Sequence, residues 1–374
     1  MTEQHFRLFG SSRPTSEAIE EVDPRASLTV TIYVRRDPRG AQAPTVRELS
    51  RLEPHARTYL QPEQAVAVFG AAQADLDAVS AFALEHGLKV REQSIAKRLV
   101  RVTGPAKKLG DAFGVKLRHY KRGEDKYRSH EGDIQLPASL AGIVTGVLGF
   151  DNRKMVRSQP RASRKHPPGS EAAQALAANT YTPPTVAKLF DFPAGDGAGQ
   201  CVAVLAFNGE VMSTGQSAAG GYDRTALEGY FTNTLGQAAP KLTDVVVQGP
   251  GNAPGNGENP DDCTGEVLLD LCTVGSLVPG ANVAVYFTEF TEEGWVNAIK
   301  AAVSDTTNKP KVVSISYGNP EDDEKNGLWS EQAVQLVNEA FEQAAVQGIT
   351  ICCASGDSGS EDEPGATSDH VDFP

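Results

Sequence analysis

The chain has 374 residues, 35 Lys and Arg against 48 Asp and Glu, 40% hydrophobic residues and five cysteines. This length predicts two or three domains, and the composition is ordinary for a globular protein. The sequence contains no run of 18 apolar residues, and its first residues lack the apolar core of a signal peptide. These features exclude a membrane-spanning helix and a recognisable leader, so we expect a soluble protein.

Charge is divided unevenly along the chain. Up to Lys165 there are 28 Lys and Arg against 19 Asp and Glu, whereas the remainder has 7 against 29. This division predicts a basic N-terminal domain that attracts an acidic C-terminal domain at neutral pH, and attracts it less as carboxylates protonate. The alternative is a nucleic-acid-binding N-terminal domain, but its basic residues are spread out rather than concentrated in an arm or among aromatic residues.

The first part of the chain alternates predicted strands and helices. In chain order these elements are a strand at Leu28–Arg35, a helix at Ala74–Glu85, a strand at Lys97–Thr103, a helix at Ala106–Phe113 and a strand at Val115–Tyr120. Their proportion indicates a small α+β sandwich. A stretch rich in Pro, Ser, Arg and Gly follows between Arg157 and Pro184. It cannot bury a core, so we expect an exposed, protease-accessible linker.

After the linker, near-continuous apolar strands alternate with longer helices. The expected strands are Cys201–Phe207, Ala281–Phe287, Lys311–Tyr317 and Ile349–Ala354, and the expected helices are Glu266–Leu277, Glu293–Val303 and Ser330–Val346. This pattern indicates βαβ units in a doubly wound parallel sheet with helices on both faces. In such folds the functional site lies beyond the carboxyl ends of the strands.

Two acidic residues in the first of these helices, Glu266 and Asp270, are the strongest candidates for chemistry. Being four residues apart, they project from one helix face, one turn apart. Such a pair is more often a solvated face. Here, however, apolar residues for which we expect burial surround it, namely Val267, Leu268, Leu269 and Leu271. A half-buried acidic pair favours a catalytic interpretation.

Two further observations concern the same half of the chain. The segment Ser355–Ser360 follows the last predicted strand and presents Asp357 together with several backbone donors; alone it would more often be plain turn chemistry. Of seven histidines, only His370 follows the linker. A Ser-His-Asp triad therefore has one possible base, and a carboxylate is favoured as the base of any nucleophilic reaction.

The cysteines give no clear signal. Their odd number and the lack of CxxC spacing indicate neither a zinc site nor a complete disulfide framework. Cys352 and Cys353 lie in an apolar run, which predicts small buried hydrophobic residues. Cys263 and Cys272 bracket the acidic pair and are too far apart along a helix for a bridge. The redox compartment is left open.

Several motifs in order resemble the sedolisin family of serine-carboxyl peptidases, and within it the kumamolisin-like proenzymes. They are Gly265–Asp270, Ser314–Gly318, Ser355–Ser360 and His370–Pro374, with Gly132–Pro137 in the N-terminal part. The resemblance implies a subtilisin-like doubly wound parallel sheet, incomplete in this chain, preceded by a ferredoxin-like α+β prodomain. It implies a prodomain at 1–156, a processing linker at 157–181 and the N-terminal part of the peptidase domain at 182–374.

The same resemblance assigns roles to residues. Glu266 would be the general base, Asp270 its orienting partner and Asp357 the acid that stabilises the oxyanion. A Glu base is ionised where a His would already be charged, and Asp357 can donate a hydrogen bond only when protonated, so both roles predict activity in acid. Substrate binding would fall to Ser316, Tyr317, Gly318, Asp362 and Asp372, the two acids favouring basic side chains.

The resemblance also places parts of the machinery outside this sequence. The family's nucleophilic serine, in a Gly-Thr-Ser motif, and its calcium ligands are expected beyond Pro374, so we expect no metal site in this chain and no activity from it alone. Ser358 and Ser360 are disfavoured as substitutes. Two departures concern the acid network: Ala206 stands where kumamolisin-like enzymes have Glu, and Tyr317 stands where Trp is usual. A secreted, monomeric enzyme acting on proteins or peptides, without nucleic-acid or membrane partners, is implied.

Alternatives stay open at this point. One is a non-catalytic sedolisin-like module that binds peptides or inhibits an active relative through its prodomain. Another is a small-molecule enzyme on a doubly wound sheet, but no GxGxxG fingerprint follows the strand that begins at Cys201. If the protease interpretation is right, we expect acid-triggered autoprocessing within Arg157–Tyr181.

Overall fold

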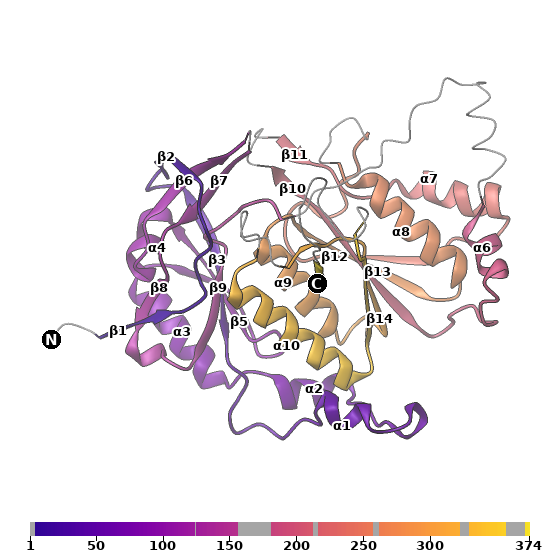
Figure 1. Cartoon of the computed structure of the whole chain (residues 1–374), viewed down its shortest axis with the longest axis horizontal. Helices are drawn as coiled ribbons and strands as arrows, with labels where there is room; N and C mark the ends of the chain where they lie inside the picture. The colour runs from indigo at the N-terminus through magenta and orange to yellow at the C-terminus, as the bar shows by residue number, and fades with distance from the viewer. Residues whose placement is uncertain are drawn as a thin grey trace.

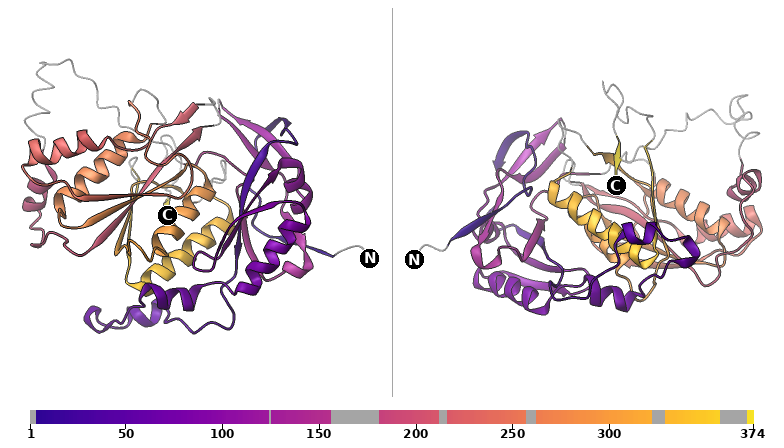
Figure 2. Two further views of the ribbon diagram at one scale, coloured as in Figure 1. Left: turned by 180° about the vertical axis from the view of Figure 1, so that it is seen from behind. Right: turned by 60° about the horizontal axis from the view of Figure 1, so that its bottom comes forward.

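The computed structural model of the chain describes residues 4–123, 125–155, 181–211, 216–256, 262–321, 329–356 and 371–374. Two domains lie side by side, an N-terminal one of strands and helices and a C-terminal one built on a parallel sheet (Figure 1). The helices of the second domain that face the first lie between the two sheets, as the views from behind and from below make clear (Figure 2).

The N-terminal domain is built on a four-stranded antiparallel sheet. Its spatial order is β4 (Lys89–Ser94), β5 (Leu99–Pro105), β3 (Ser27–Val34) and β9 (Val144–Leu148). Helix α3 (Gln73–Glu85) joins β3 to β4, and α4 (Ala106–Phe113) follows β5. A βαββαβ chain order with these neighbours is the ferredoxin-like arrangement, so the predicted α+β fold of this domain is confirmed.

Strand β3 shows why both faces of this sheet are covered. Val30, Ile32 and Val34 join the core formed with α3 and α4, whereas Tyr33 joins the core of the C-terminal domain. Alternate residues of a strand point to opposite faces, and all four are fully buried or nearly so. The second face of the sheet is therefore a domain interface.

The remaining N-terminal elements extend this domain along both sides. They are β1 (His5–Leu8) paired with β8 (Ile134–Pro137), a sheet of β2 (Glu17–Glu21), β6 (Leu117–Arg122) and β7 (Asp125–His130), and the short helices α1 (Val46–Ser50), η1 (Pro54–Ala56), α2 (Pro62–Phe69) and η2 (Ala138–Leu140). The segment carrying α1 and α2 runs beneath the C-terminal domain (Figure 1), where Leu60 N–H donates to Val346 O at 3.0 Å.

The C-terminal domain is a parallel sheet, as predicted. Its order is β12 (Lys241–Val246), β13 (Asn282–Glu289), β10 (Cys201–Val211), β14 (Val312–Ile315) and β16 (Thr350–Cys353), with β11 (Gln216–Ala218) added antiparallel to β10. The chain starts at the centre, moves to one side and then crosses to the other, which is the doubly wound topology.

Helices cover both faces of this sheet. Helices α6 (Pro183–Leu189), α7 (Arg224–Gly229), η3 (Tyr230–Leu235) and α8 (Thr264–Leu277) lie on one side, and α9 (Glu292–Val303) and α10 (Glu331–Gln347) on the other (Figure 1). Along β10, Val204 and Ala206 join the α8 core, whereas Ala203, Leu205 and Phe207 join the α9 and α10 core. Helices α9 and α10 are thus buried between two sheets.

Three local predictions were wrong. Cys352 and Cys353 are exposed rather than buried, because β16 is an edge strand of the described sheet. Leu269 is 60% exposed, since it lies on the outer side of α8. The strand predicted to reach Tyr317 ends at Ile315, so the residues after it form a connecting segment. All five cysteines are free thiols in the structure.

The small elements around residue 320 form a separate two-stranded sheet. Strand β15 (Asn319–Pro320) pairs antiparallel with β17 (Asp372–Phe373).

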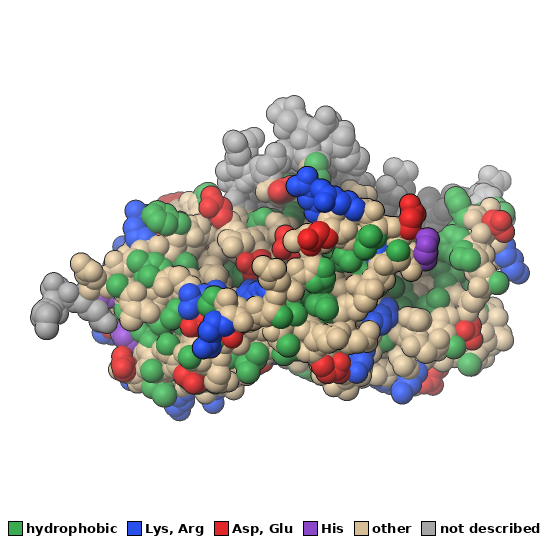
Figure 3. Space-filling view, turned by 90° about the horizontal axis from the view of Figure 1, so that it is seen from below, with side chains coloured by type: hydrophobic (Ala, Val, Ile, Leu, Met, Phe, Trp, Pro, Cys, Tyr) green, Lys and Arg blue, Asp and Glu red, His purple; other side chains and the backbone are tan. Residues whose placement is uncertain are grey.

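Within the described ranges, no single helix is long and apolar enough to cross a membrane; only α2 and α3 together, bent by 64°, pass on length and composition. On the face seen from below, the described Lys and Arg side chains lie beside Asp and Glu rather than in one patch (Figure 3).

Candidate active site

The start of helix α8 is held by a set of polar contacts at the carboxyl ends of the strands. Asp262 Oδ1 accepts a hydrogen bond from the Thr264 amide at 2.8 Å, and Thr264 Oγ1 accepts one from the Gly255 amide at 2.7 Å. The Cys263 amide donates to Ala219 O at 2.9 Å. The first of these bonds satisfies an amide that the helix start leaves without a partner, and the three bonds together fix the position of the helix start.

The acidic pair lies in the first two turns of this helix. Val267 and Leu271 are fully buried against the sheet, and this sets the rotation of the helix. In that rotation Asp270 is 8% exposed and Glu266 is half-buried. The expected half-buried carboxyl pair is therefore present, with Asp270 the deeper member.

Asp270 contacts Ser316, the residue that follows β14. The Ser316 hydroxyl donates to Asp270 Oδ1 at 2.6 Å, a short bond of the kind that an ionised acceptor gives. The second oxygen, Oδ2, is buried and has no hydrogen-bond partner among the described residues. The contact joins α8 to β14, which neighbours the central strand β10.

The surroundings of Asp270 shift its pKa toward neutral pH. Burial raises the pKa of Asp270 to about 7; the hydrogen bond from Ser316 opposes this rise, and the charge of Glu266 adds to it. Below that pH the protonated form of Asp270 is favoured, which removes one negative charge from the pair.

Tyr317, the second residue after β14, lies near both carboxyl groups of the pair. Its ring is buried and meets Phe207 edge-on, with centroids 4.9 Å apart. Burial, followed by the nearby Cys263, Asp270 and Glu266, raises the pKa of Tyr317 well above its usual value. The phenol stays neutral throughout the acid range, so it adds no charge to the pair.

Ala206 occupies the position where the resemblance implied a departure from the family. It is fully buried on the face of β10 that packs against Val267 and Leu271 of α8. A methyl group there extends the apolar layer beneath the pair and offers no third carboxyl group.

The remaining candidate residues fall into two groups. Gly318 lies against Asp372, since a Cβ atom at Gly318 would be 3.1 Å from Asp372 Cγ. Asp357, Asp362, Ser358, Ser360 and His370 lie outside the described residues. The structure thus brings together Glu266, Asp270, Ser316 and Tyr317, and places Gly318 beside Asp372. Within the described ranges no three His, Cys, Asp or Glu residues form a group that could hold a metal ion.

Sequence reasoning missed three contacts at this site, made by Ser316, Asp262 and Thr264. Ser316 was predicted only as a substrate-binding residue, yet its hydroxyl also contacts Asp270. Asp262 and Thr264 anchor the helix start, and the Asp-Cys-Thr sequence before an apolar run was an available capping signal.

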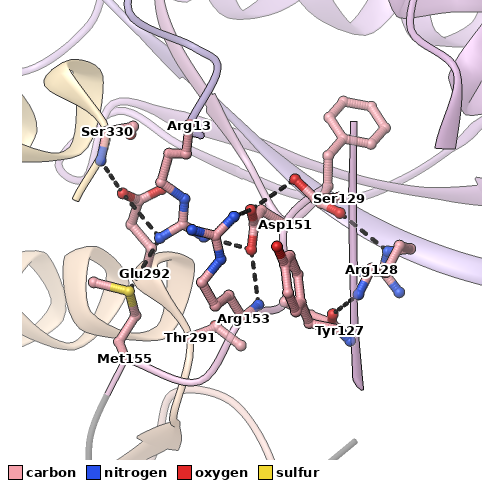
Figure 4. A network of polar contacts seen from close by, with 12 residues as sticks. Arg13, Tyr127, Arg128, Ser129, Asp151, Arg153, Met155, Thr291, Glu292 and Ser330 are labelled. Carbon is pink, nitrogen blue, oxygen red and sulfur yellow. Dashed lines mark hydrogen bonds and ion pairs between the residues drawn. The ribbon is translucent and has the colours of Figure 1, made fainter. Parts of the chain in front are cut away.

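A second polar cluster joins the two domains at the start of α9 (Figure 4). Arg13, whose side chain is 2% exposed, pairs with Asp151 at 2.5 Å and lies 3.7 Å from Glu292. Glu292 Oε1 also accepts a hydrogen bond from the Ser330 amide at 2.5 Å. Arg13 and Asp151 belong to the N-terminal domain, so Glu292 is the contribution of the C-terminal domain.

Other contacts continue this interface along α9 and α10. The Gln332 amide group accepts from Val147 N–H at 2.8 Å and donates to Val147 O at 3.0 Å. Thr31 of β3 donates a hydrogen bond to Glu293. Tyr33 OH donates to Asn297 Oδ1 at 2.7 Å. Polar groups from both domains are paired within an apolar contact, as buried polar groups require.

The carboxyl groups of this interface differ in proton affinity. Burial would raise the pKa of Asp151, but Arg13 and Arg153 outweigh it and hold the pKa at about 2. Burial raises the pKa of Glu292, and Arg13 opposes that rise only in part. Burial raises the pKa of Glu293 to about 7, against the hydrogen bond from Thr31.

These features define a class of protein: an α+β domain docked on the helices of a doubly wound α/β domain that carries a half-buried carboxyl pair at its strand ends. Residues 14–153 match the family model described as Pro-kumamolisin, activation domain. The chain is 39% identical to kumamolisin of Bacillus sp. (strain MN-32) over 349 residues, 93% of this chain and 60% of that protein. It is 25% identical to tripeptidyl-peptidase sed5 of Aspergillus fumigatus, over 99% of this chain and 64% of that protein.

A solved structure of Pseudomonas sedolisin, titled a serine-carboxyl proteinase complexed with two molecules of pseudo-iodotyrostatin, overlaps 52% of this chain and 50% of that one, with 22% identity and a TM-score of 0.39. The sequence relationships support the resemblance drawn from the motifs: the N-terminal domain matches a pro-kumamolisin activation domain, and the chain is similar to kumamolisin over 93% of its length. The chain spans less than two thirds of the length of the two relatives named above.

Proposed function

We infer that this chain is the precursor form of an acid-active endopeptidase, with an activation domain at 1–156, a processing linker at 157–181 and peptidase-domain residues at 182–374. The observation that carries this inference is the half-buried pair of Glu266 and Asp270 at the strand ends, in a chain that is similar to kumamolisin over 93% of its length. The raised pKa of Asp270 supports an acid working range, because the pair then holds one proton to share.

The proposed reaction is peptide-bond hydrolysis by a Ser-Glu-Asp triad. Glu266 takes the proton of a serine hydroxyl, supplied by chain that follows Pro374, as the serine oxygen attacks the substrate carbonyl carbon. Asp270 holds and shares the proton of Glu266, and Asp357 donates a hydrogen bond to the oxyanion. The proton then passes from Glu266 to the leaving amine, and water resolves the acyl-enzyme by the same route in reverse.

Substrate contacts are proposed along the segment that follows β14. The backbone of Ser316, Tyr317 and Gly318 would pair with an extended peptide, while Asp362 and Asp372 would favour basic side chains. The position of Asp372 against Gly318 supports its part in this proposal. A calcium ion bound beyond Pro374, secretion and a monomeric state complete the proposal and rest on the resemblance to the sedolisin family alone.

The test is hydrolysis of a denatured protein by the full-length enzyme at pH 3 to 5. Glu266→Gln keeps the shape of the side chain but removes the base, and we expect its activity to fall by about 100-fold or more. Glu228→Gln is the matched control, because it changes an exposed Glu of the neighbouring helix α7 and should keep full activity. Wild-type rates in Glu266→Gln would exclude this mechanism.

Maturation offers an independent test of the precursor assignment. We expect the full-length protein, incubated near pH 4, to be shortened within Arg157–Tyr181, with the new N-terminus read by mass spectrometry. Glu266→Gln should remain intact under the same conditions. If wild-type precursor survived prolonged incubation uncut, the assignment of 157–181 as a processing linker would be wrong.

A further inference from the structure

Ser316 makes a contact that the proposed substrate role of its backbone does not need. It is the first residue after β14, and its half-buried side chain turns toward α8, where the hydroxyl donates to Asp270 Oδ1 at 2.6 Å. Among the described residues, this is the one side-chain hydrogen bond observed at Asp270. The bond connects a strand end and a helix that belong to different βα units.

The two oxygens of Asp270 are made unequal by this contact. Oδ1 accepts from Ser316, whereas Oδ2 is buried without a partner in the part of the chain that the structure describes. A protonated carboxyl group carries its proton on one oxygen and accepts through the other. With Oδ1 occupied as an acceptor, the proton of Asp270 belongs on Oδ2.

We propose that Ser316 is a positioning residue of the acidic pair: its hydroxyl fixes the carboxyl group of Asp270 and leaves Oδ2 as the oxygen that carries the proton of the protonated form. This proposal rests on the proposed function of the pair. It assigns to Ser316 a role through Asp270, in addition to any contact of its backbone with substrate. Without the hydroxyl, Asp270 could rotate about its side-chain bonds and carry its proton on either oxygen.

The surroundings of Asp270 make this hydrogen bond the main support of its ionised form. The titratable groups that interact with it in the described structure are Glu266 on the same helix and Tyr317 after β14. Neither is a cation. Burial and Glu266 both disfavour the carboxylate, and the bond from Ser316 is the one side-chain interaction that favours it.

The direct test is a titration of the Asp270 carboxyl carbon by carbon-13 NMR in the full chain, with Asp270→Asn to assign the signal. In Ser316→Ala, the carboxylate loses a hydrogen bond, so the pKa of Asp270 should rise by about one unit. Ser316→Thr keeps a hydroxyl and should restore the wild-type value. Ser276→Ala is the matched control, because Ser276 donates to Thr273 O on the same helix at 3.1 Å and should leave the pKa unchanged.

A second variant guards against a folding defect. Ser316→Cys is similar in size and donates weakly, so it should shift the pKa of Asp270 in the same direction as Ser316→Ala. An unchanged or lowered pKa in both variants would overturn the proposal, since a bond that favours the carboxylate cannot be lost without raising the value.

Kinetics of the full-length enzyme separate this role from substrate binding. The positioning role predicts that Ser316→Ala lowers kcat and moves its pH profile upward, with little change in KM, and that Ser316→Thr recovers both. A rise in KM with an unmoved pH profile would assign Ser316 to substrate binding instead and refute the proposal. Failure of the proposed function itself has a different signature: Glu266→Gln would stay active while the NMR shift in Ser316→Ala persisted.

Discussion

Glu293 offers the sharpest test of how the two domains hold together. It lies in the first turn of α9, is 5% exposed and accepts a hydrogen bond from Thr31 in the sheet of the activation domain. The substitution Glu293→Gln removes its charge and keeps its shape. An amide at this position can still accept the bond from Thr31, so the variant isolates the effect of ionisation.

The size of the effect follows from the pKa. Burial raises the pKa of Glu293 from 4.5 to about 7. A carboxyl group whose pKa is raised by folding stabilises the folded, docked state while it is protonated. This stabilisation falls as the pH rises and the group ionises. The contribution is complete below the unfolded-state pKa and is lost as pH rises to 7. With about 1.4 kcal/mol per pKa unit, the loss between pH 4.5 and 7.5 is about 3 kcal/mol.

The measurement is the free energy of unfolding of the full chain in urea, from pH 4.5 to 8. Relative to wild type, Glu293→Gln should become more stable as pH rises, by about 3 kcal/mol over that range. Glu342→Gln, which changes an exposed Glu of α10, controls for the loss of one negative charge. Parallel stability curves for wild type and Glu293→Gln would refute the reasoning, because they would mean that Glu293 titrates as an exposed group does.

Two further predictions concern the other buried charges. Arg13→Met leaves Asp151 and Glu292 without their shared cation and should lower the free energy of unfolding at pH 7 by about 3 to 5 kcal/mol, whereas Arg25→Met, at a side chain 90% exposed, should change it little. Asp270→Asn should abolish peptidase activity and yet raise stability at pH 8, by up to about 4 kcal/mol, since it removes a carboxyl group whose pKa is raised from 3.8 to about 7. A Tm of Asp270→Asn above that of wild type at pH 8 would support this prediction, and an equal or lower Tm at that pH would contradict it.

The fold could be predicted where a pattern is local. The helix at Ala106–Phe113 has the predicted bounds, because Gly114 with positive φ ends it and apolar residues recur at the helical period. The central strands could be predicted from their continuous apolar runs. Strand β12 (Lys241–Val246) was missed because charged and polar residues interrupt it at the edge of the sheet.

The site could be predicted only in part, since its contacts depend on strand order. Glu266 and Asp270 share a helix face, so their pairing follows from sequence spacing. The bond between Asp270 and Ser316 exists because β14 pairs with β10 beneath α8, and spacing along the chain carries no such information. The same holds for Glu293, whose partner Thr31 lies in the other domain.

Two carboxyl groups with a pKa near 7, those of Asp270 and Glu293, take up protons over the same range of pH. Lowering the pH from 7 to 4.5 protonates Asp270 at the acidic pair and Glu293 at the domain interface. In the proposed mechanism the first change prepares the site for an acid reaction. The second change stabilises docking of the two domains, in opposition to the loosening that the overall charge division predicts.

The titration of Asp151 does not change the expectation that protonation of Glu293 tightens docking of the two domains. Its pKa of about 2 reflects pairing with Arg13 and Arg153 inside the activation domain, so its stabilising contribution is lost only as pH falls toward 2. We therefore expect cleavage of the linker to precede separation of the domains. After cleavage, the two parts should still elute together in size-exclusion chromatography at pH 5 and should separate only at lower pH. Separation at pH 5 before any cut is detected would mean that the dispersed surface charges outweigh Glu293.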